Sequence, residues 1–410
     1  MRGWTTKTIG ELCDAGGGKV QTGPFGSQLH ESDYAETGTP VVMPKNILSG
    51  QIEEEGIARV SEAHVFRLRR HKLAKGDIVY GRRGDIGRQA LIREEYVGWL
   101  CGTGCLRITL GKAQVSPQFL HQYLQVSDVI RWIENQAIGA TMLNLNTNIL
   151  RRIPVTFPVD FQTQFAITGL LSGYDALIEN NRRRISLLEK LAEDIYREWF
   201  IRFRFPGHEH VETFKGLPND WEVKKLGGIL TLLYGKALRD EDRVPGGVPV
   251  YGSSGVVGMH NEALVAEPGL IVGRKGNVGS VYWSDTGFFP IDTVYFVQSK
   301  LPNEYVYFLL RSMNFINNDS AVPGLNRGQA YSNQLLLPPV PLIKQFAEIV
   351  APQFAMKKSL ALQNTKLIEA RDKLLPRLLS GKLAVEGLNI QSPPDIGGEL
   401  NSRPVGAAYA

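Results

Sequence analysis

The chain has 410 residues, enough for two or three domains with cores of ordinary size. Its composition is 43% hydrophobic and 21% charged residues. No apolar run approaches the roughly 20 residues that cross a bilayer, which argues against a membrane protein. No apolar segment follows the first residues, which argues against a secreted protein. We therefore expect a cytoplasmic protein whose formal net charge of +5 permits nucleic acid as a partner without requiring it.

The predicted elements form two similar blocks. Residues 1–161 contain short apolar runs such as "GDIVYG" and "CLRITL", separated by Gly, Pro and Asn, a pattern that is typical of strands and turns. A long amphipathic helix is expected over 162–205. Residues 206–341 repeat the strand-rich pattern with "GLIVG" and "TVYFV", and a second long helix is expected over 342–386. The remaining residues, 387–410, are expected to form a disordered tail.

The second block is a diverged copy of the first. "GRRGDIG" at 81–87 returns as "GRKGNVG" at 273–279, and each follows a short apolar run. Trp4 with "KTIGEL" matches Trp221 with "KKLGGIL", and "RRIPVTFPVDFQTQFAI" matches "LLLPPVPLIKQFAEI". The matches occur in the same order in both halves, which indicates a tandem duplication.

Both expected helices carry residues that recur at every seventh position, as in a helix seam. The rows are Ile167, Tyr174, Asn181, Leu188 and Ile195 with Leu170, Leu177, Arg184 and Leu191 three positions on, and Phe346, Gln353, Leu360, Leu367 and Leu374 with Ile349, Met356, Gln363 and Ala370 three positions on. Helices of this length extend roughly 55 to 60 Å, more than such a domain is wide, so we expect them to pair with each other instead of each lining its own core. A pseudo-twofold repeat makes the pair antiparallel.

The sequence contains no recognisable catalytic or metal site. "GRRGDIG" lacks the spacing of a phosphate loop. "DWEVK" at 220–224 has the residue types of a nuclease centre but not their arrangement, and no motif of a base methyltransferase is present. Cys13, Cys101 and Cys105 lack the spacing of a zinc site and are expected to be buried thiols. We expect the chain not to be an enzyme by itself.

The two glycine-rich loops are better suited to contact nucleic acid. Glycine permits a tight turn, and arginine can bind a guanine edge or a phosphate with two hydrogen bonds. Asn-rich turns lie near both loops in sequence. An isolated basic loop is often an ordinary surface turn, but here it recurs at matching places. The candidate DNA contacts are Lys45, Asn46, Arg82, Arg83, Arg88, Thr141, Asn144, Asn146, Ser253, Ser254, Arg274, Lys275, Asn277, Asn326 and Arg327.

With these motifs, nearly the whole chain resembles the specificity subunit of type I restriction-modification systems. "GPFGSQLHESDYAETGTPVVMPKNI" with "AKGDIVYGRRGDIGRQALI", and "VPVYGSSGVVGMHNEAL" with "GLIVGRKGNVGSVYW", resemble the openings of two kinds of target-recognition domain. "NLNTNILRRIPVTFPVDFQTQFAI" and "LLPRLLSGKLAV" resemble a joint and the end of the family's spacer helices. The second joint, with Asn326 alone and no threonine, departs from the first.

The resemblance implies an α+β fold with two similar strand-rich target-recognition domains separated by a pair of long antiparallel coiled-coil helices. It also implies double-stranded DNA as a partner, read as a split and asymmetric target. Two modification subunits would dock on the helices and bring S-adenosylmethionine, and motor-nuclease subunits would join for cleavage. Two alternatives stay open: the specificity part of another type of restriction-methylation enzyme, and a coiled-coil scaffold that does not bind DNA.

Overall fold

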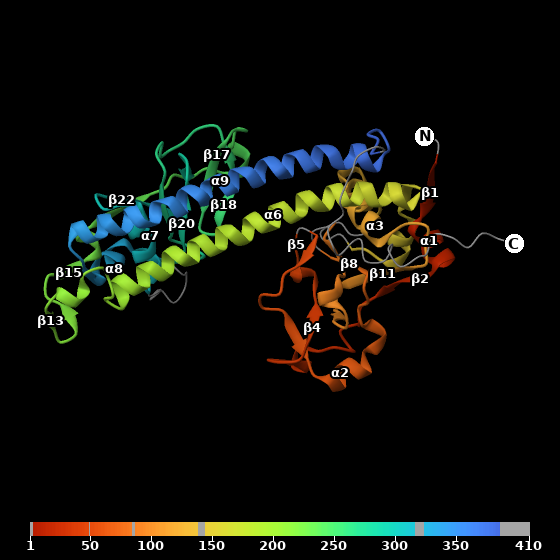
Figure 1. Cartoon of the computed structure of the whole chain (residues 1–410), viewed down its shortest axis with the longest axis horizontal. Helices are drawn as coiled ribbons and strands as arrows, with labels where there is room; N and C mark the ends of the chain where they lie inside the picture. Colours follow the sequence, from red (N-terminus) through yellow and green to blue (C-terminus); the bar gives the residue numbers. More distant parts are fainter. Residues whose placement is uncertain (1–2, 49, 84–86, 138–143, 316–323, 386–410) are drawn as a thin grey trace. The chain divides into compact units, whose positions relative to one another are not determined.

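The computed structural model describes residues 3–48, 50–83, 87–137, 144–315 and 324–385 (Figure 1). The chain forms two compact units, which consist of residues 1–179 with 365–410 (unit 1) and residues 180–364 (unit 2). Each unit contains a strand-rich region and parts of both long helices. Thr141 and the expected tail from 387 onward lie outside the described residues.

Unit 1 is built around a four-stranded antiparallel sheet with the strand order β2-β11-β8-β9. A second sheet has the order β10-β4-β7-β3, and β1 pairs with β12. The strands are β1 (Trp4–Thr8), β2 (Gly17–Thr22), β3 (Tyr34–Ala35), β4 (Thr39–Val42), β5 (Ile47–Leu48), β6 (Gln51–Ile52), β7 (Ala58–Val60), β8 (Ile78–Gly81), β9 (Gln89–Leu91), β10 (Leu100–Cys101), β11 (Cys105–Gly111) and β12 (Pro154–Pro158). The short helices are α1 (Ile9–Gly16), α2 (Glu62–Arg67), α3 (Pro117–Tyr123), α4 (Ser127–Gln136) and α5 (Thr147–Arg152).

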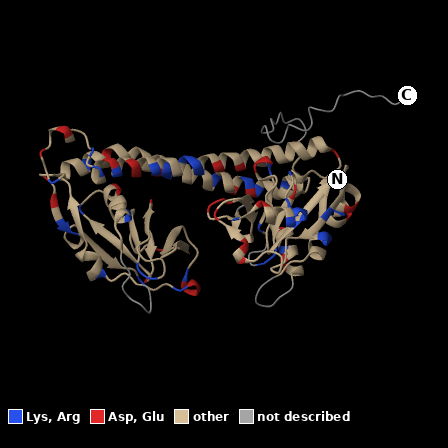
Figure 2. Ribbon diagram, turned by 90° about the horizontal axis from the view of Figure 1, so that it is seen from below, with Lys and Arg blue, Asp and Glu red and all other residues tan. Residues whose placement is uncertain are grey.

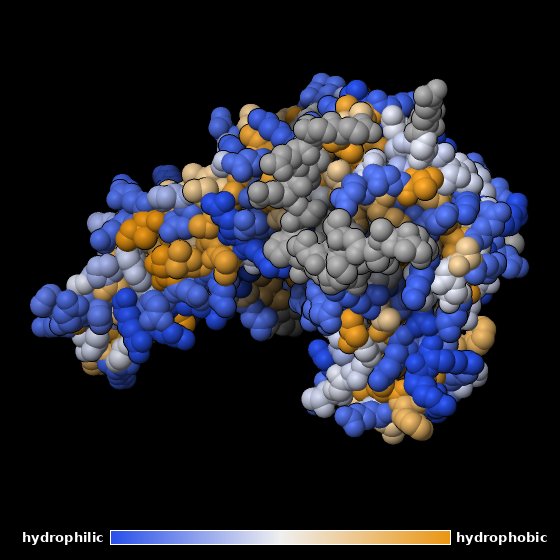
Figure 3. Space-filling view, turned by 45° about the vertical axis from the view of Figure 1, so that its right-hand side comes forward, coloured by the Kyte–Doolittle hydropathy of each residue, from blue (hydrophilic) through white to orange (hydrophobic). Residues whose placement is uncertain are grey.

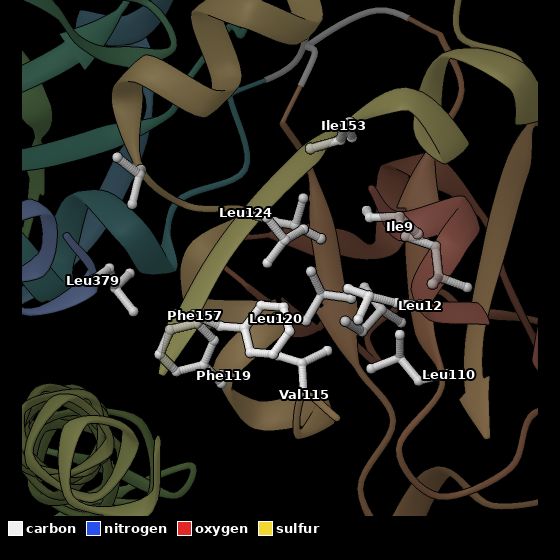
Figure 4. Close-up of a cluster of buried hydrophobic side chains, with 14 of the residues drawn as sticks. Ile9, Leu12, Leu110, Val115, Phe119, Leu120, Leu124, Ile153, Phe157 and Leu379 are labelled. Carbon is white, nitrogen blue, oxygen red and sulfur yellow. The ribbon is translucent and has the colours of Figure 1, made fainter. Parts of the chain in front are cut away.

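Local sequence explains where α1 begins and ends. Thr8 and Glu11 form a capping box at its start, and Gly17 ends it with φ of 69°, a left-handed conformation that glycine adopts without strain. The apolar face of α1 then packs with α3 and β12 in the core of unit 1, to which Leu379 also belongs (Figure 4).

Unit 2 repeats this plan. Its main sheet has the order β16-β22-β19-β20, β15 pairs with β23, and a three-stranded sheet has the order β18-β17-β21. The strands are β13 (Thr213–Phe214), β14 (Leu217–Pro218), β15 (Glu222–Lys225), β16 (Leu230–Tyr234), β17 (Val248–Gly252), β18 (Gly255–His260), β19 (Gly269–Gly273), β20 (Val281–Ser284), β21 (Phe289–Pro290), β22 (Val294–Ser299) and β23 (Gln334–Leu337). The short helices are α7 (Asn303–Ser312) and α8 (Arg327–Ser332).

The internal repeat is therefore confirmed at the level of topology. Strands β2, β11, β8 and β9 correspond in order and direction to β16, β22, β19 and β20. The parallel pair β4–β10 corresponds to β17–β21. The expected α+β class with two similar strand-rich domains is likewise confirmed.

The two long helices are α6 (Phe161–Tyr196, 36 residues) and α9 (Val340–Leu379, 40 residues). A π-helical turn, η5 (Arg197–Ile201), follows α6, and Phe203 then takes up a left-handed φ of 58°. Both helices end before the expected 205 and 386. The apolar pattern continues past the last helical turn because the following residues, such as Phe205 and Val385, are buried in the cores of the two units.

The helices pair antiparallel. In unit 2, Nδ2 of Asn181 donates a hydrogen bond to Oδ1 of Asn364 (3.0 Å), and Glu189, further along α6, pairs with Lys357, which is earlier in α9 (2.8 Å). In unit 1, Asp175 pairs with Arg371 (2.7 Å). Polar residues therefore satisfy one another across the seam and specify its register.

The second row of the expected seam is wrong by one residue on both helices. Leu177 is 53% exposed and Ile349 41% exposed, whereas their neighbours Ile178 (3%) and Val350 (0%) are buried. The second row thus follows the first by four positions instead of three, and Arg184, Met356 and Gln363 are exposed with Leu177 and Ile349. Residues three and four apart both neighbour a given helical residue, so spacing alone does not choose between them. The first row is buried or half-buried: Tyr174, Asn181, Leu188, Ile195, Phe346, Leu360, Leu367 and Leu374.

The buried asparagine pair allows a stability test. Asn181→Ala leaves the Oδ1 of Asn364 without this donor in a buried seam, so we expect the free energy of unfolding to fall by about 1–3 kcal/mol. The double variant Asn181→Leu/Asn364→Leu removes both amides and is expected to be at least as stable as the single variant. Denaturant unfolding followed by helical circular dichroism measures both, and Asn180→Ala, an exposed neighbour, is the control. A stable single variant would contradict a stabilising pair.

A buried histidine of unit 1 predicts a pH dependence. His121 on α3 hydrogen-bonds Gln89 through Nδ1 (2.8 Å) and Gln125 through Nε2 (3.1 Å), and burial lowers its pKa to about 4. The unfolded chain, with an ordinary histidine pKa, binds the proton more tightly, so the contribution of His121 to stability is present above about pH 6.5 and is lost as the pH falls towards 4. We expect His121→Gln to reduce the slope of stability against pH in this window by up to about 1.4 kcal/mol per pH unit. Unchanged slopes in urea unfolding at several pH values would contradict this assignment.

Candidate nucleic-acid interface

The basic loop of unit 1 begins where β8 ends. The backbone N–H of Leu145 donates to the carbonyl oxygen of Arg82 (2.9 Å), and Nε of Arg82 donates to Oδ1 of Asn144 and to the carbonyl oxygen of Leu145 (both 3.1 Å). Arg82 is therefore half-buried and fastens the loop to the segment before α5, whereas Arg83 is exposed. Arg88, at the far side of the loop, is half-buried.

The basic loop of unit 2 is fastened at the equivalent place. The N–H of Leu325 donates to the carbonyl oxygen of Arg274 (2.7 Å). The carbonyl oxygen of Leu325, however, accepts from the hydroxyl of Tyr295 (3.0 Å), where unit 1 uses an arginine. Burial raises the pKa of Tyr295, which keeps its hydroxyl protonated as a donor. The carbonyl oxygen of Leu325 therefore does not need the side chain of Arg274 as a donor.

The side chain of Arg274 instead lies against aromatic rings. Its guanidinium carbon is 5.0 Å from the ring centroid of Tyr234 and 5.8 Å from that of Tyr295, and Nη1 donates to the carbonyl oxygen of Asp292 (3.0 Å). The guanidinium carbon of Arg327, at the start of α8, is 5.1 Å from the same Tyr234 ring. Sequence analysis missed Tyr234. The only feature of the sequence that could have indicated Tyr234 is its position at the end of a strand, directly before a glycine.

Three of the expected DNA-contact residues make hydrogen bonds that support the local structure. Oδ1 of Asn146 caps α5 by accepting from the N–H of Ile149 (3.0 Å), and Oδ1 of Asn326 caps α8 by accepting from the N–H of Gly328 (2.8 Å). Asn46 is 3% exposed, and its amide bonds the backbone of its own turn. The Oδ1 atoms accept these bonds because helix starts and buried turns leave backbone N–H groups that need acceptors.

The remaining candidates lie on turns beside the two loops. Ser253 is half-buried, and a Cβ on Gly276 would lie 3.1 Å from its Oγ, so the turn of Ser253 lies against the basic loop of unit 2. In unit 1, a Cβ on Gly81 would lie 3.8 Å from Pro44, next to the exposed Lys45. The other exposed candidates are Ser254, Lys275 and Asn277.

Each unit therefore presents basic side chains that have no acidic partner among the described residues: Arg83 in unit 1, and Arg274, Lys275 and Arg327 in unit 2. Along the long helices, by contrast, Lys and Arg alternate with Asp and Glu (Figure 2). Unpaired guanidinium and ammonium groups on turns are suited to phosphates and base edges.

The sequence predicts that the metal-binding and thiol groups form no site. The described residues contain no group of His, Cys, Asp and Glu that could hold a metal ion. Cys13, Cys101 and Cys105 are buried, as expected, and burial raises the pKa of Cys13 to about 11 and that of Cys101 to about 12, which makes them poor nucleophiles. An open groove of 490 Å³ in unit 2 is lined by charged residues of α6, η5 and α7 such as Glu189, Lys190 and Arg311.

The face in Figure 3 is mainly hydrophilic, and its hydrophobic residues form separate patches. Within the described part of the chain, every helix is too short or too polar to cross a membrane.

Comparison with known proteins places these features in a family. The family model described as "Type I restriction modification DNA specificity domain" matches residues 1–190 and 218–369. The MjaIX type I restriction enzyme specificity subunit of Methanocaldococcus jannaschii is 24% identical, with 94% of each chain covered. A putative type I specificity subunit of Mycoplasma genitalium is 23% identical over 77% of this chain and 76% of its own.

A solved structure has the same fold. The crystal structure of the type I restriction-modification S subunit from M. genitalium superposes with a TM-score of 0.55 at 20% identity, covering 92% of this chain and 96% of that chain. Since the family model matches both copies of the internal repeat and most of the chain, the protein belongs to the family of type I restriction-modification DNA specificity subunits.

Proposed function

We propose that the chain reads a split, asymmetric DNA target in the cytoplasm, with one half-site for each unit, and carries out no chemistry itself. The supporting observation is that one loop framework occurs twice with different side chains. The joints Leu145–Arg82 and Leu325–Arg274 are alike, but the exposed residues are Arg83 in one unit and Lys275 in the other. Different side chains on one framework favour different base pairs.

The proposed partners are two modification subunits that dock on the long helices and motor-nuclease subunits that join for cleavage. The modification subunits would bring S-adenosylmethionine and methylate an extruded base, and this chain would need no cofactor. In support, the long helices carry large apolar side chains that neither strand-rich region covers. Those at least 40% exposed include Leu177, Leu187, Leu191, Ile349, Met356 and Leu362. Exposed apolar side chains of this size are typical of protein interfaces.

We also propose that the helix pair sets the spacing between the half-sites. The seam in each unit is made of specific polar pairs, Asp175–Arg371 in unit 1 and Asn181–Asn364 in unit 2, which resist slippage of one helix along the other. A fixed register gives the pair a fixed length, and this length would then define the gap in the target.

The function is tested by methylome sequencing of cells that express the chain with its modification partner. We expect one interrupted motif with two different halves, and no methyl transfer by the purified chain alone. A scaffold would yield no motif. A symmetric motif would contradict the assignment of different half-sites to the two units.

The two loop arginines of unit 1 are expected to behave differently. Arg83→Ala removes an exposed guanidinium that has no acidic partner among the described residues, so we expect affinity for duplexes that carry the first half-site to fall by about 1–3 kcal/mol without a change in thermal stability. Arg82→Ala removes two internal hydrogen bonds, so we expect it to lower the melting temperature of unit 1. Lys275→Ala is the matched control and is expected to affect the second half-site only. Equal effects of Arg83→Ala on both half-sites in competition binding would contradict the assignment.

A further inference from the structure

The ring of Tyr234 contacts two arginines that come from distant parts of the chain. It ends β16, Arg274 follows β19, and Arg327 begins α8. We propose that Tyr234 is a positioning residue that holds the guanidinium groups of Arg274 and Arg327 ready to bind DNA at the second half-site. This inference rests on the proposed function and adds a residue and a physical role to it.

The ring of Tyr234 is itself held in place. Its centroid is 5.0 Å from that of Tyr295, and the hydroxyl of Tyr295 is anchored on the carbonyl oxygen of Leu325 (3.0 Å). Tyr234 nevertheless stays 48% exposed. A ring that is fixed on one side and open on the other can order long side chains at the surface without burying them.

Contact with a ring leaves the binding capacity of arginine available. A guanidinium group stacked on an aromatic face keeps its N–H donors at its edge, where they can reach a phosphate or the O6 and N7 of guanine. Nη1 of Arg274 donates to the carbonyl oxygen of Asp292 (3.0 Å). Holding two such flexible side chains before DNA arrives removes part of the entropy cost of binding.

Unit 1 lacks this arrangement at the equivalent place. Thr22, at the end of β2, occupies the position of Tyr234, and each is followed by a glycine whose Cβ would meet a backbone carbonyl oxygen at 2.0 to 2.1 Å (Gly23 and Gly235). No side chain larger than glycine fits after either residue. Arg82 is meanwhile bound to Asn144. The paired arginines are therefore specific to unit 2, and their loss should affect one half-site only.

The test uses the complete complex with its modification subunits and a duplex that carries the motif found by methylome sequencing. We expect Tyr234→Leu to weaken binding by about 5- to 30-fold, because the two arginine side chains must then be ordered on binding at a cost of about 0.5–1 kcal/mol each. Tyr234→Phe keeps the ring and is expected to stay within about twofold of the unaltered complex. On a duplex truncated so that neither the bases nor the phosphates of the second half-site remain, Tyr234→Leu and the unaltered complex are expected to bind alike.

Two further variants separate positioning from a general structural effect. Phe214→Leu removes another exposed ring of unit 2, over which Lys215 lies at 5.3 Å, and it should leave binding unchanged. In an Arg274→Ala/Arg327→Ala background, Tyr234→Leu should cause no additional loss, because nothing remains for the ring to position.

The outcomes are distinct. The inference is overturned if Tyr234→Phe is as damaging as Tyr234→Leu, if Tyr234→Leu binds normally, or if its loss persists in the double-alanine background or on the truncated duplex. If the arginines contact phosphates, Tyr234→Leu lowers the salt slope of binding. If they contact bases, the variant relaxes the recognised motif instead. Absence of any sequence-specific binding by the unaltered complex would instead refute the proposed function.

Discussion

One backbone hydrogen bond, present in both units, is the constraint on which the candidate interface depends. A leucine N–H before a short helix donates to the carbonyl oxygen of the arginine that follows a central strand, at 2.9 Å in unit 1 (Leu145 to Arg82) and 2.7 Å in unit 2 (Leu325 to Arg274). The leucine side chains are buried, so the bond ties each glycine-rich loop to a core. A loop held in this way can vary its side chains without losing its position.

The two units satisfy the same leucine carbonyl differently, and this difference determines what their arginines can do. A buried carbonyl needs a donor. In unit 1 the donor is Nε of Arg82, so that arginine becomes part of the framework. In unit 2 the donor is the hydroxyl of Tyr295, and Arg274 lies against Tyr234 at the surface. A single exchange of donor thus converts a structural arginine into a candidate ligand-binding one.

Paired polar groups also fix the register of the two long helices. Their seams contain Asp175–Arg371 in unit 1, and Asn181–Asn364 and Glu189–Lys357 in unit 2. Purely apolar rows could slide past each other with little loss, whereas a displaced amide or charge would be buried without its partner. The leucines next to the seam, such as Leu177 and Leu191, are exposed.

The sequence by itself determined the repeat, the class of fold and the existence of two long paired helices, because these follow from local periodicity and from the order of similar strings. It also identified the two basic loops, but not the use of each side chain within them. Asn146 and Asn326 cap helices, Asn46 is buried, and Tyr234 meets its arginines only when three distant segments come together. The choice between Leu177 and Ile178 for the seam likewise needed the partner helix. Local patterns specify which elements form, but the partner of a polar or surface side chain depends on segments far away in the chain, so only the tertiary structure decided it.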